Sequence, residues 1–175
     1  MSIKIGLVGK AGTGKDTVAA YLMAVYGFKK FAFADRLKEI DYELFGPTEG
    51  KNRKRLQEFG QFCRTIDPDV WVKQLDKRLQ GYTGNAVITD IRQKNELDYC
   101  KRNGFVIVKI TCQLETRLQR MKERGDNFSF ETLFHETETQ LDEFPYDYWI
   151  DNNGTFNDLT SQVDYIIRDI QALAK

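Results

Sequence analysis

The chain has 175 residues, with 26 basic and 26 acidic side chains and therefore no net charge, and 41% of its residues are hydrophobic. This size and composition predict one globular domain with a sizeable core. The balanced charge argues against a general nucleic-acid coat or a polybasic membrane binder. No apolar run approaches ~18 residues, so no membrane-spanning helix is expected. The N-terminus lacks the pattern of a signal peptide, and three scattered cysteines favour a reducing, cytoplasmic location.

Charge is distributed unevenly along the chain. Residues 1–64 contain 12 basic and 7 acidic side chains, whereas residues 111–175 contain 6 basic and 13 acidic ones. Two solvated faces of opposite charge would explain this difference. A basic lining over an anionic site, built mainly from the first 125 residues, would explain it equally well.

Short apolar segments alternate with amphipathic ones. In chain order they predict a strand at 3–8, a helix at 17–26, a strand at 31–33, helices at 36–45, 51–64 and 68–79, a strand at 86–89, a helix at 93–103, a strand at 105–110, helices at 114–124 and 129–142, a strand at 148–150 and a last helix. This alternation predicts an α/β fold, in which a parallel sheet is covered by helices on both faces.

Local signals predict several helix ends and buried faces. Asp67 is a cap that is followed by Pro68 at the first helical position, and Gly104 ends the helix at 93–103. Thr155 and Asp158 form a capping box for the last helix. Apolar stripes predict the core-facing sides of the first and last helices: Val18, Leu22 and Val25, and Leu159, Val163, Ile166, Ile167 and Ile170.

The segment between the first strand and the first helix carries the strongest functional signal. Residues 9–15 fit the phosphate-loop pattern G-x-x-x-x-G-K. Glycines let the backbone curl so that its N–H groups point at phosphate oxygens, and the following helix presents its positive end to the same anion. Lys15 then reaches the β- and γ-phosphates as a catalytic cation. The predicted phosphate-binding residues are Gly9, Ala11, Gly12, Thr13, Gly14 and Lys15.

Asp16 stands where this pattern normally carries Ser or Thr, and Thr17 follows it. Both residues are counted with the nucleotide-binding loop. The Asp16 carboxylate could hold Mg²⁺ directly or through water. It could equally act as a favourable acid at the start of the helix, and both interpretations stay open.

Residues 9–19 resemble the deoxynucleoside monophosphate kinases of bacteria and their phages, in which Asp after the loop lysine is usual. Further segments resemble this family in the same order: Phe-Ala-Asp-Arg-Leu-Lys at 33–38, residues 56–72, Thr-Asp-Ile-Arg at 89–92 with Asn-Glu at 95–96, and Asn-Gly-Thr at 153–155. The resemblance covers nearly the whole chain.

The resemblance implies a three-layer P-loop nucleoside monophosphate kinase fold with a five-stranded parallel sheet. The whole chain, 1–175, would form one kinase domain. Its core would comprise about 1–35, 81–112 and 147–175. Residues of about 36–80 would form a helical acceptor-binding insertion, and those of about 113–146 a lid.

Three polar residues follow predicted strands, namely Asp35, Asp90 and Arg92. Ligands of open α/β sheets lie beyond the carboxyl ends of the strands, so these residues are expected to converge near the phosphate loop. Asp90 resembles the Walker-B acid, which would bind Mg²⁺, although it could simply cap the strand end. Arg92 suits a bidentate phosphate contact, with an ion pair to Glu96 as the alternative.

Arg64 is the candidate for the acceptor phosphate, both by the resemblance and by its position past the second insertion helix. Asp35, Lys38 and Arg92 are further candidate substrate contacts. Trp71 could stack on the nucleobase, although an aromatic residue at a helical position is more often part of the core.

Arg117, Arg120 and Arg124 fall on one stripe of the helix at 114–124, because their spacing is i, i+3 and i+7. Three cations on one stripe would repel one another without an anion. They are therefore interpreted as a clamp for the transferred phosphoryl group, with a solvated face as the alternative. The family resemblance favours Arg120 and Arg124 as the catalytic pair, and Arg120 also as an ATP contact.

His135 is the only histidine and shares a predicted helix face with Glu131 and Glu138. One imidazole beside two glutamates is weak evidence for a metal site, so a structural or lid role is expected. The turn at 151–155, with Asn153, Gly154 and Thr155 as the candidate contacts, resembles the loop that holds adenine by backbone contacts in related P-loop kinases, with a plain turn as the alternative.

The prediction is ATP- and Mg²⁺-dependent phosphoryl transfer to a nucleoside monophosphate, giving the diphosphate. A phosphate acceptor is already mostly ionised at pH 7, since its second pKa is ~6, so it needs arginines rather than a base. An alcohol acceptor, as in dephospho-coenzyme A kinases, needs a carboxylate base, and Asp35 sits where that base would lie. A phosphomevalonate kinase and a non-catalytic nucleotide-binding protein remain alternatives. The expected partner is a small-molecule nucleotide rather than nucleic acid or a membrane, and a homodimer stays open.

Overall fold

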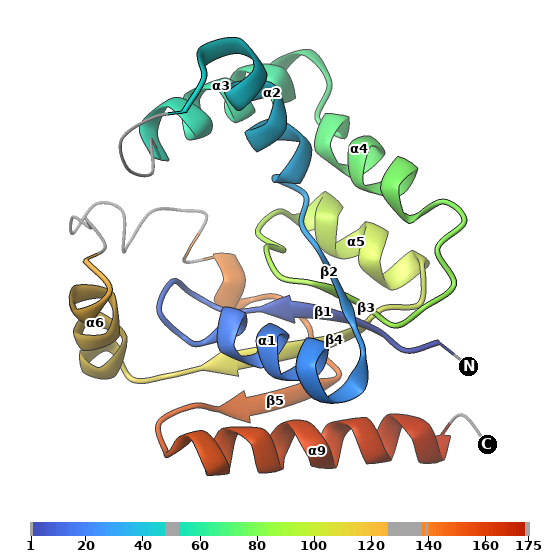
Figure 1. The fold of residues 1–175 in the computed structure, drawn as a ribbon, viewed down its shortest axis with the longest axis vertical. Coiled ribbons are helices and arrows are strands. Elements are labelled where there is room, and N and C mark those ends of the chain that lie inside the picture. Colours follow the sequence, from blue (N-terminus) through green and yellow to red (C-terminus); the bar gives the residue numbers. More distant parts are fainter. Residues whose placement is uncertain (1, 48–52, 126–137, 139, 174–175) are drawn as a thin grey trace. The chain divides into compact units, whose positions relative to one another are not determined.

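The computed structural model describes residues 2–47, 53–125, 138 and 140–173 (Figure 1). The chain forms two compact units. The sheet unit comprises Met1–Lys30 and Gly84–Lys175, and the insertion unit comprises Phe31–Thr83. The single-domain prediction, and the roles expected for 36–80 and 113–146, remain predictions.

The five strands lie in the order β2-β3-β1-β4-β5. Their bounds are β1 Lys4–Val8, β2 Lys29–Phe31, β3 Ala86–Ile88, β4 Val106–Thr111 and β5 Tyr148–Asp151. In the centre, Ile5 of β1 is in parallel register with Val87 on one side and Val106 on the other. The central strands are nearly continuous apolar runs because both of their faces are buried. The predicted parallel α/β sheet is confirmed.

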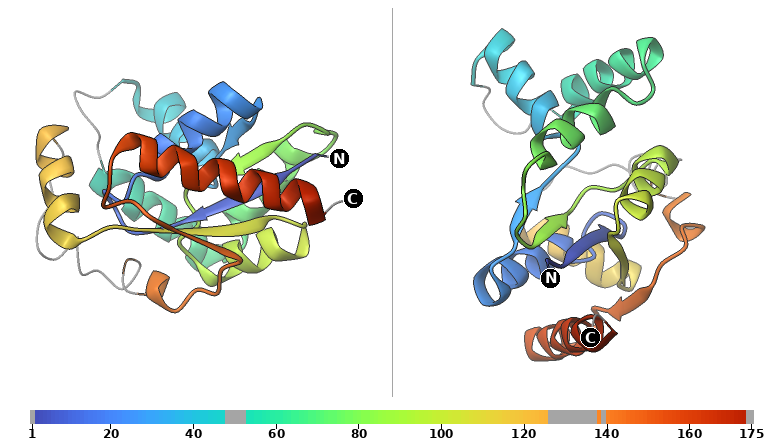
Figure 2. Two further views of the ribbon diagram at one scale, coloured as in Figure 1. Left: turned by 90° about the horizontal axis from the view of Figure 1, so that it is seen from below. Right: turned by 90° about the vertical axis from the view of Figure 1, so that its right-hand side faces the viewer.

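Helices cover both faces of this sheet (Figure 2). On one face, α1 (Lys15–Tyr26) and α9 (Phe156–Leu173) pack on alternate residues of β1 and β4 to form the main core. On the other face lies α5 (Lys94–Arg102). Gly6 of β1 faces α5, and a Cβ there would lie 2.6 Å from Ile91 Cδ1. The sheet unit also contains α6 (Leu114–Glu123) and the 3₁₀ turn η1 (Gln140–Asp142).

The insertion unit is helical, with α2 (Asp35–Phe45), α3 (Arg53–Ile66) and α4 (Val70–Leu79). Trp71 is buried in it, and its indole Nε1 donates a hydrogen bond of 3.1 Å to Gly60 O. Arg55 of α3 makes two hydrogen bonds of 2.7 Å to the Asp41 carboxylate of α2. An aromatic anchor and a bidentate ion pair thus tie its helices together.

Several element boundaries differ from the prediction by one to three residues, and two of these differences have a clear local cause. β2 begins at Lys29 rather than residue 31, because the Lys29 N–H already donates to Asn85 O at 2.8 Å. α4 begins at Val70, because the Asp67 carboxylate accepts the Asp69 N–H and so closes a turn before the helix rather than capping it.

Other helix predictions fare unequally. The capping box is confirmed, since Thr155 N–H donates to the Asp158 carboxylate and Asp158 N–H donates to Thr155 Oγ1. The stripe predicted for α1 is wrong at Val25, which is 55% exposed, while Ala19 is buried instead. The predicted helix at 129–142 falls mostly outside the described residues. Among the helices that are described, none has the length and apolar character needed to cross a membrane.

We expect Trp71→Phe to lower the free energy of unfolding by about 1–3 kcal/mol, because it removes a buried hydrogen bond and part of a core ring. Urea denaturation followed by circular dichroism measures this change. Phe62→Leu is the control, since Phe62 is 60% exposed in the neighbouring helix α3 and should change stability little. Equal stability of Trp71→Phe and wild type would contradict an anchoring role for Trp71.

Candidate functional site

The segment joining β1 to α1 curls back on itself. Gly12 and Gly14 have φ angles of +81° and +101°, which residues other than glycine rarely adopt. Neighbouring groups also exclude side chains, because a Cβ on Gly14 would collide with Asn152 Nδ2. A Cβ on Gly9 would come within 2.5 Å of Ile110 O. The glycines of the pattern G-x-x-x-x-G-K are therefore required by this backbone path.

Side chains from distant parts of the sheet unit hold the carbonyl groups of this loop. Asn152, which follows β5, donates through Nδ2 to Thr13 O at 2.8 Å. Arg117 of α6 donates through Nε to Ala11 O at 2.8 Å. Both side chains are almost fully buried. With the carbonyls held from outside, the loop keeps its curl.

Lys15 turns its ammonium back into the loop, where it donates to Gly9 O and, at 3.0 Å, to Lys10 O. Burial, followed by the charge of Arg92, lowers the pKa of Lys15 to about 8, while the charges of Glu138 and Asp16 oppose this shift. Burial thus holds the ammonium at an electrostatic cost, which these two carboxylates only partly offset. Phosphate oxygens would relieve that cost.

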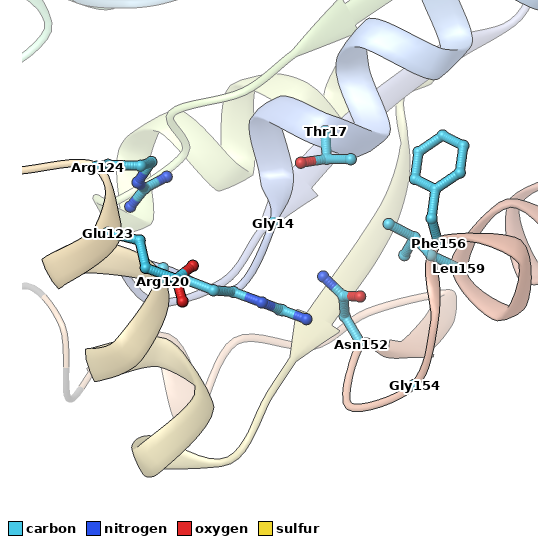
Figure 3. Close-up of a pocket in the computed structure, with 10 residues that line it drawn as sticks. Gly14, Thr17, Arg120, Glu123, Arg124, Asn152, Gly154, Phe156 and Leu159 are labelled. Atoms are coloured by element: carbon cyan, nitrogen blue, oxygen red, sulfur yellow. The ribbon is translucent and has the colours of Figure 1, made fainter.

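A pocket of about 310 Å³ opens beside the loop, entirely within the sheet unit (Figure 3). Arg120 extends from α6 into it, and Asn152 and Phe156 line the opposite side (Figure 3). Its lining residues come from the loop and α1, from α6 and its C-terminal end, and from the turn before α9 and the first turn of α9: Gly12, Gly14, Thr17, Arg120, Glu123, Arg124, Asn152, Gly154, Phe156 and Leu159.

This pocket brings together part of the predicted nucleotide site, namely Gly12, Gly14, Thr17, Arg120, Arg124 and Gly154. Asn153 and Thr155 do not line it. Asn153 accepts the Gln113 N–H at 2.8 Å, and Thr155 belongs to the capping box of α9. Sequence reasoning placed Asn152 in the predicted adenine-holding turn without giving its side chain a role, and it missed Phe156. Phe156 had a signal, because an aromatic residue at the polar start of a capped helix has little core to enter, and it is 60% exposed.

The three arginines of α6 and its C-terminal end divide into two kinds. Arg120 and Arg124 line the pocket, as expected of a clamp. Arg117 is buried against the loop backbone instead. Its Nη2 is buried with no hydrogen-bond partner among the described residues. The prediction that all three face one ligand therefore needs correcting at Arg117, which supports the loop.

The two acidic candidates for metal binding lie in the first turn of α1 and just after the end of β3. Asp16 pairs with Lys30 at 2.8 Å, and this hydrogen bond holds the Asp16 pKa below its usual range. Asp90 follows β3 and is partly buried. In the part of the chain that the structure describes, no cluster of three or more His, Cys, Asp or Glu side chains could hold a metal ion. The metal-binding roles of Asp16 and Asp90 therefore stay predictions. In such a site, phosphate oxygens of the nucleotide would be needed as further ligands.

The side chain of Arg92 pairs with a different carboxylate from the one weighed as its alternative partner, Glu96. Its main-chain N–H donates to the Glu96 carboxylate at 2.8 Å, but its guanidinium pairs with Glu138. The ion pair weighed for Arg92 and Glu96 is thus replaced by one with a residue far along the chain. His135 and Glu131 lie outside the described residues.

Four predicted substrate contacts belong to the insertion unit. Asp35 accepts the Ala32 N–H at 2.9 Å at the start of α2, and Lys38 is exposed on the same helix. Arg64 is partly buried on α3. Trp71 is 3% exposed, which favours the core role weighed for it. The substrate roles of all four remain predictions.

We expect Gly14→Ala to lower the free energy of unfolding by about 1–3 kcal/mol more than Gly27→Ala does. Gly27, at the end of α1, also has a positive φ (+66°), but a Cβ there would meet no atom within 4 Å. Gly27→Ala therefore introduces backbone strain without a steric clash, whereas Gly14→Ala introduces the strain and also displaces the Asn152 side chain. Urea denaturation compares the two, and equal losses would show that the contact with Asn152 is not restrictive.

Lys15 should make stability depend on pH. Its folded-state pKa of about 8 lies below the ordinary value of 10.5, so between these pH values the unfolded chain binds more protons than the folded one. The free energy of unfolding should therefore rise with pH in this window. Relative to Lys15→Met, wild type should gain about 1–3 kcal/mol between pH 8 and 10.5 in urea denaturation. A constant difference would mean that the ammonium is well solvated.

Comparisons with known proteins agree with this geometry. The family model described as an AAA domain matches residues 5–139. A protein of Acanthamoeba polyphaga mimivirus named "Putative deoxynucleotide monophosphate kinase" is 27% identical over 92% of this chain and 94% of its own length.

Solved structures share the fold at low sequence identity. Shikimate kinase from Acinetobacter baumannii has a TM-score of 0.61 at 14% identity, covering 100% of this chain and 97% of its own. The protein TT1252 from Thermus thermophilus has a TM-score of 0.60 at 20% identity, covering 96% and 97% of the two chains. A gluconokinase from Sinorhizobium meliloti has a TM-score of 0.58 at 15% identity, covering 99% and 98%. The fold, the loop and the matched family together show that this chain belongs to the AAA domain family and is a kinase of the P-loop type.

Proposed function

We propose that the protein transfers the γ-phosphoryl group of ATP to a deoxynucleoside monophosphate and releases the diphosphate. The observation that carries this proposal is the pocket in which Arg120 and Arg124 line a cavity beside Gly12 and Gly14 of the loop. Phosphoryl transfer depends mainly on positioning and on neutralising phosphate charge, and this pocket offers both. The name of the mimivirus relative supports the same acceptor class.

The donor nucleotide would lie along the loop. Backbone N–H groups of residues 9–15 would hold its phosphates, with Asp16 and Thr17 at the start of α1. Lys15, Arg120 and Arg124 would carry the positive charge that stabilises the transferred group. The Asn153–Thr155 turn would contact the base, since Gly154 lines the pocket. A volume of about 310 Å³ falls at the small end of the range for ligand pockets.

The carboxylates present suit Mg²⁺, which usually takes one or two protein carboxylates, several waters and substrate phosphates. Asp16 and Asp90 would hold the ion. When bound, it would neutralise charge on the β- and γ-phosphates. The chain's own cations act on the same oxygens from the loop and from α6.

The acceptor would be bound by Asp35, Lys38, Arg64 and Arg92, while Trp71, which is 3% exposed, would support the insertion unit from its core. Its attacking phosphate oxygen is already ionised near neutral pH, so arginines suffice and no general base is needed. A dephospho-coenzyme A kinase would instead use Asp35 as a base for an alcohol. A phosphomevalonate kinase would use the arginines on a different phosphate ester.

We also propose residues 36–80 as the acceptor-binding insertion of a single kinase domain, and 113–146 as the lid. The site of action would be the cytoplasm.

A coupled assay of ADP release with ATP and Mg²⁺ tests the function. The acceptor panel contains the four deoxynucleoside monophosphates, their ribonucleotide counterparts, dephospho-coenzyme A and phosphomevalonate. Turnover on a deoxynucleotide supports the proposal, and turnover confined to another class replaces it. Lys15→Ala should remove most turnover while circular dichroism stays unchanged, because the loop keeps its other supports. Full turnover in that variant would refute the site.

We expect Arg64→Ala to raise the KM of the acceptor by about tenfold or more while changing the KM of ATP less than twofold, since a charged hydrogen bond contributes about 1.5–3 kcal/mol. Steady-state kinetics with each substrate varied in turn measures both values. Arg102→Ala is the control, because Arg102 is an exposed arginine on α5. An effect confined to the KM of ATP would remove Arg64 from the acceptor site.

A further inference from the structure

The phosphate loop already holds a carboxylate. Glu138 Oε2 accepts the main-chain N–H of Ala11 at 2.8 Å, and Oε1 pairs with the guanidinium of Arg92. The side chain of Glu138 is only 5% exposed. A loop whose N–H groups serve phosphate oxygens is thus engaged by an anion of the chain itself.

Three cations interact with the charge of this carboxylate. Besides Arg92, the ammonium of Lys15 and the guanidinium of Arg117 interact with its charge, which opposes the lowering of their pKa values by burial. The Nη2 of Arg117 is nevertheless buried without a partner among the described residues. One cation and one backbone N–H thus contact the carboxylate, and two further cations act on it through their charges. A phosphoryl group, with more charge and three acceptor oxygens, would satisfy this set more completely.

We propose that the Glu138 carboxylate occupies the place of the terminal phosphate of ATP, and that ATP must displace it to bind. The loop lysine is the group that reaches the β- and γ-phosphates, and Glu138 acts on that lysine. The Ala11 N–H and Arg92 would pass from Glu138 to the γ-phosphoryl group. This inference rests on the proposed function only in requiring that ATP binds at the loop.

Displacement makes Glu138 a determinant of specificity between nucleotides. ATP must release the carboxylate from a backbone N–H and an arginine, whereas the phosphates of ADP end at the β position and leave it in place. The affinity of wild type for ATP is therefore lowered relative to its affinity for ADP. After transfer, the carboxylate returns to the vacated cations and keeps Arg92 paired.

Glu138→Gln tests this competition, because it removes the charge and keeps both the volume and an oxygen that can accept the Ala11 N–H. Isothermal titration with MgATP and with MgADP at pH 6.5, where the Lys15 ammonium is charged, gives the two Kd values. The ratio of Kd for MgADP to Kd for MgATP should rise by about tenfold or more, given the strength of hydrogen bonds to charged groups.

Asp142→Asn is the matched control. Asp142 pairs with Lys10 of the loop at 2.6 Å, but its side chain is 61% exposed, and it makes no contact with Ala11 or Arg92 among the contacts of the described residues. The Asp142→Asn substitution also removes one negative charge beside the loop. It should change the ratio of Kd for MgADP to Kd for MgATP less than twofold. Glu138→Asp serves if Glu138→Gln fails to fold. It keeps the charge, but its shorter side chain cannot reach both partners, so the ratio should rise by a smaller factor.

An unchanged ratio in a folded Glu138 variant would overturn the proposal. Weaker binding of MgATP relative to MgADP would also overturn it, since Glu138 would then support the triphosphate. These outcomes are independent of the acceptor. Failure of the proposed function appears as absent turnover on every nucleoside monophosphate, while the ratio of the two affinities is still measured.

Discussion

The curled backbone of residues 9–15 is the constraint on which the rest of the site depends. N–H groups that converge on one point repel one another unless an anion is present, and the carbonyl groups behind them must be held. Asn152 and Arg117 hold those carbonyls from the end of β5 and from α6. The same two segments contribute the far walls of the pocket. Support of the loop and formation of the pocket are therefore one structural requirement.

The buried cations that suit the loop for binding an anion also lower the stability of the folded chain. The pKa of Lys15 is lowered by its surroundings, and Arg117 has a buried nitrogen without a partner in the described part of the chain. A protein selected only for stability would replace such groups with apolar ones. An anionic ligand removes the cost, so part of the binding energy of a nucleotide arises from strain relieved in the protein rather than from new contacts alone.

Sequence patterns predicted the elements and the loop because both depend on local chemistry. The strands are apolar runs. The loop is a seven-residue motif in which the spacing of the glycines and the lysine is typical of a phosphate-binding turn. The pocket positions of Arg120 and Arg124 also agree with helical spacing. Helical spacing alone could not distinguish the role of Arg117 from the roles of Arg120 and Arg124. It predicts the direction in which a side chain points, but not which group of the folded chain the side chain meets. The start of β2 was missed for a similar reason, because it depends on Asn85 in a distant segment.

Contacts between distant residues account for what the sequence could not show. Asn152 and Thr13 are 139 positions apart, and Glu138 and Ala11 are 127 apart. An asparagine in a turn and a glutamate in an acidic segment have ordinary local explanations. Only the fold reveals that both reach the same loop. For Trp71, the aromatic residue at a helical position proved to be buried and hydrogen-bonded within its own unit.

The chain has two tryptophans, and each unit contains one of them. Trp71 is buried in the insertion unit, whereas Trp149 on β5 of the sheet unit is 55% exposed. An indole in an apolar interior emits at shorter wavelength than one in contact with water. Intrinsic fluorescence therefore contains a separate spectral component for each unit, and the order in which the two units lose structure can be followed without an added label.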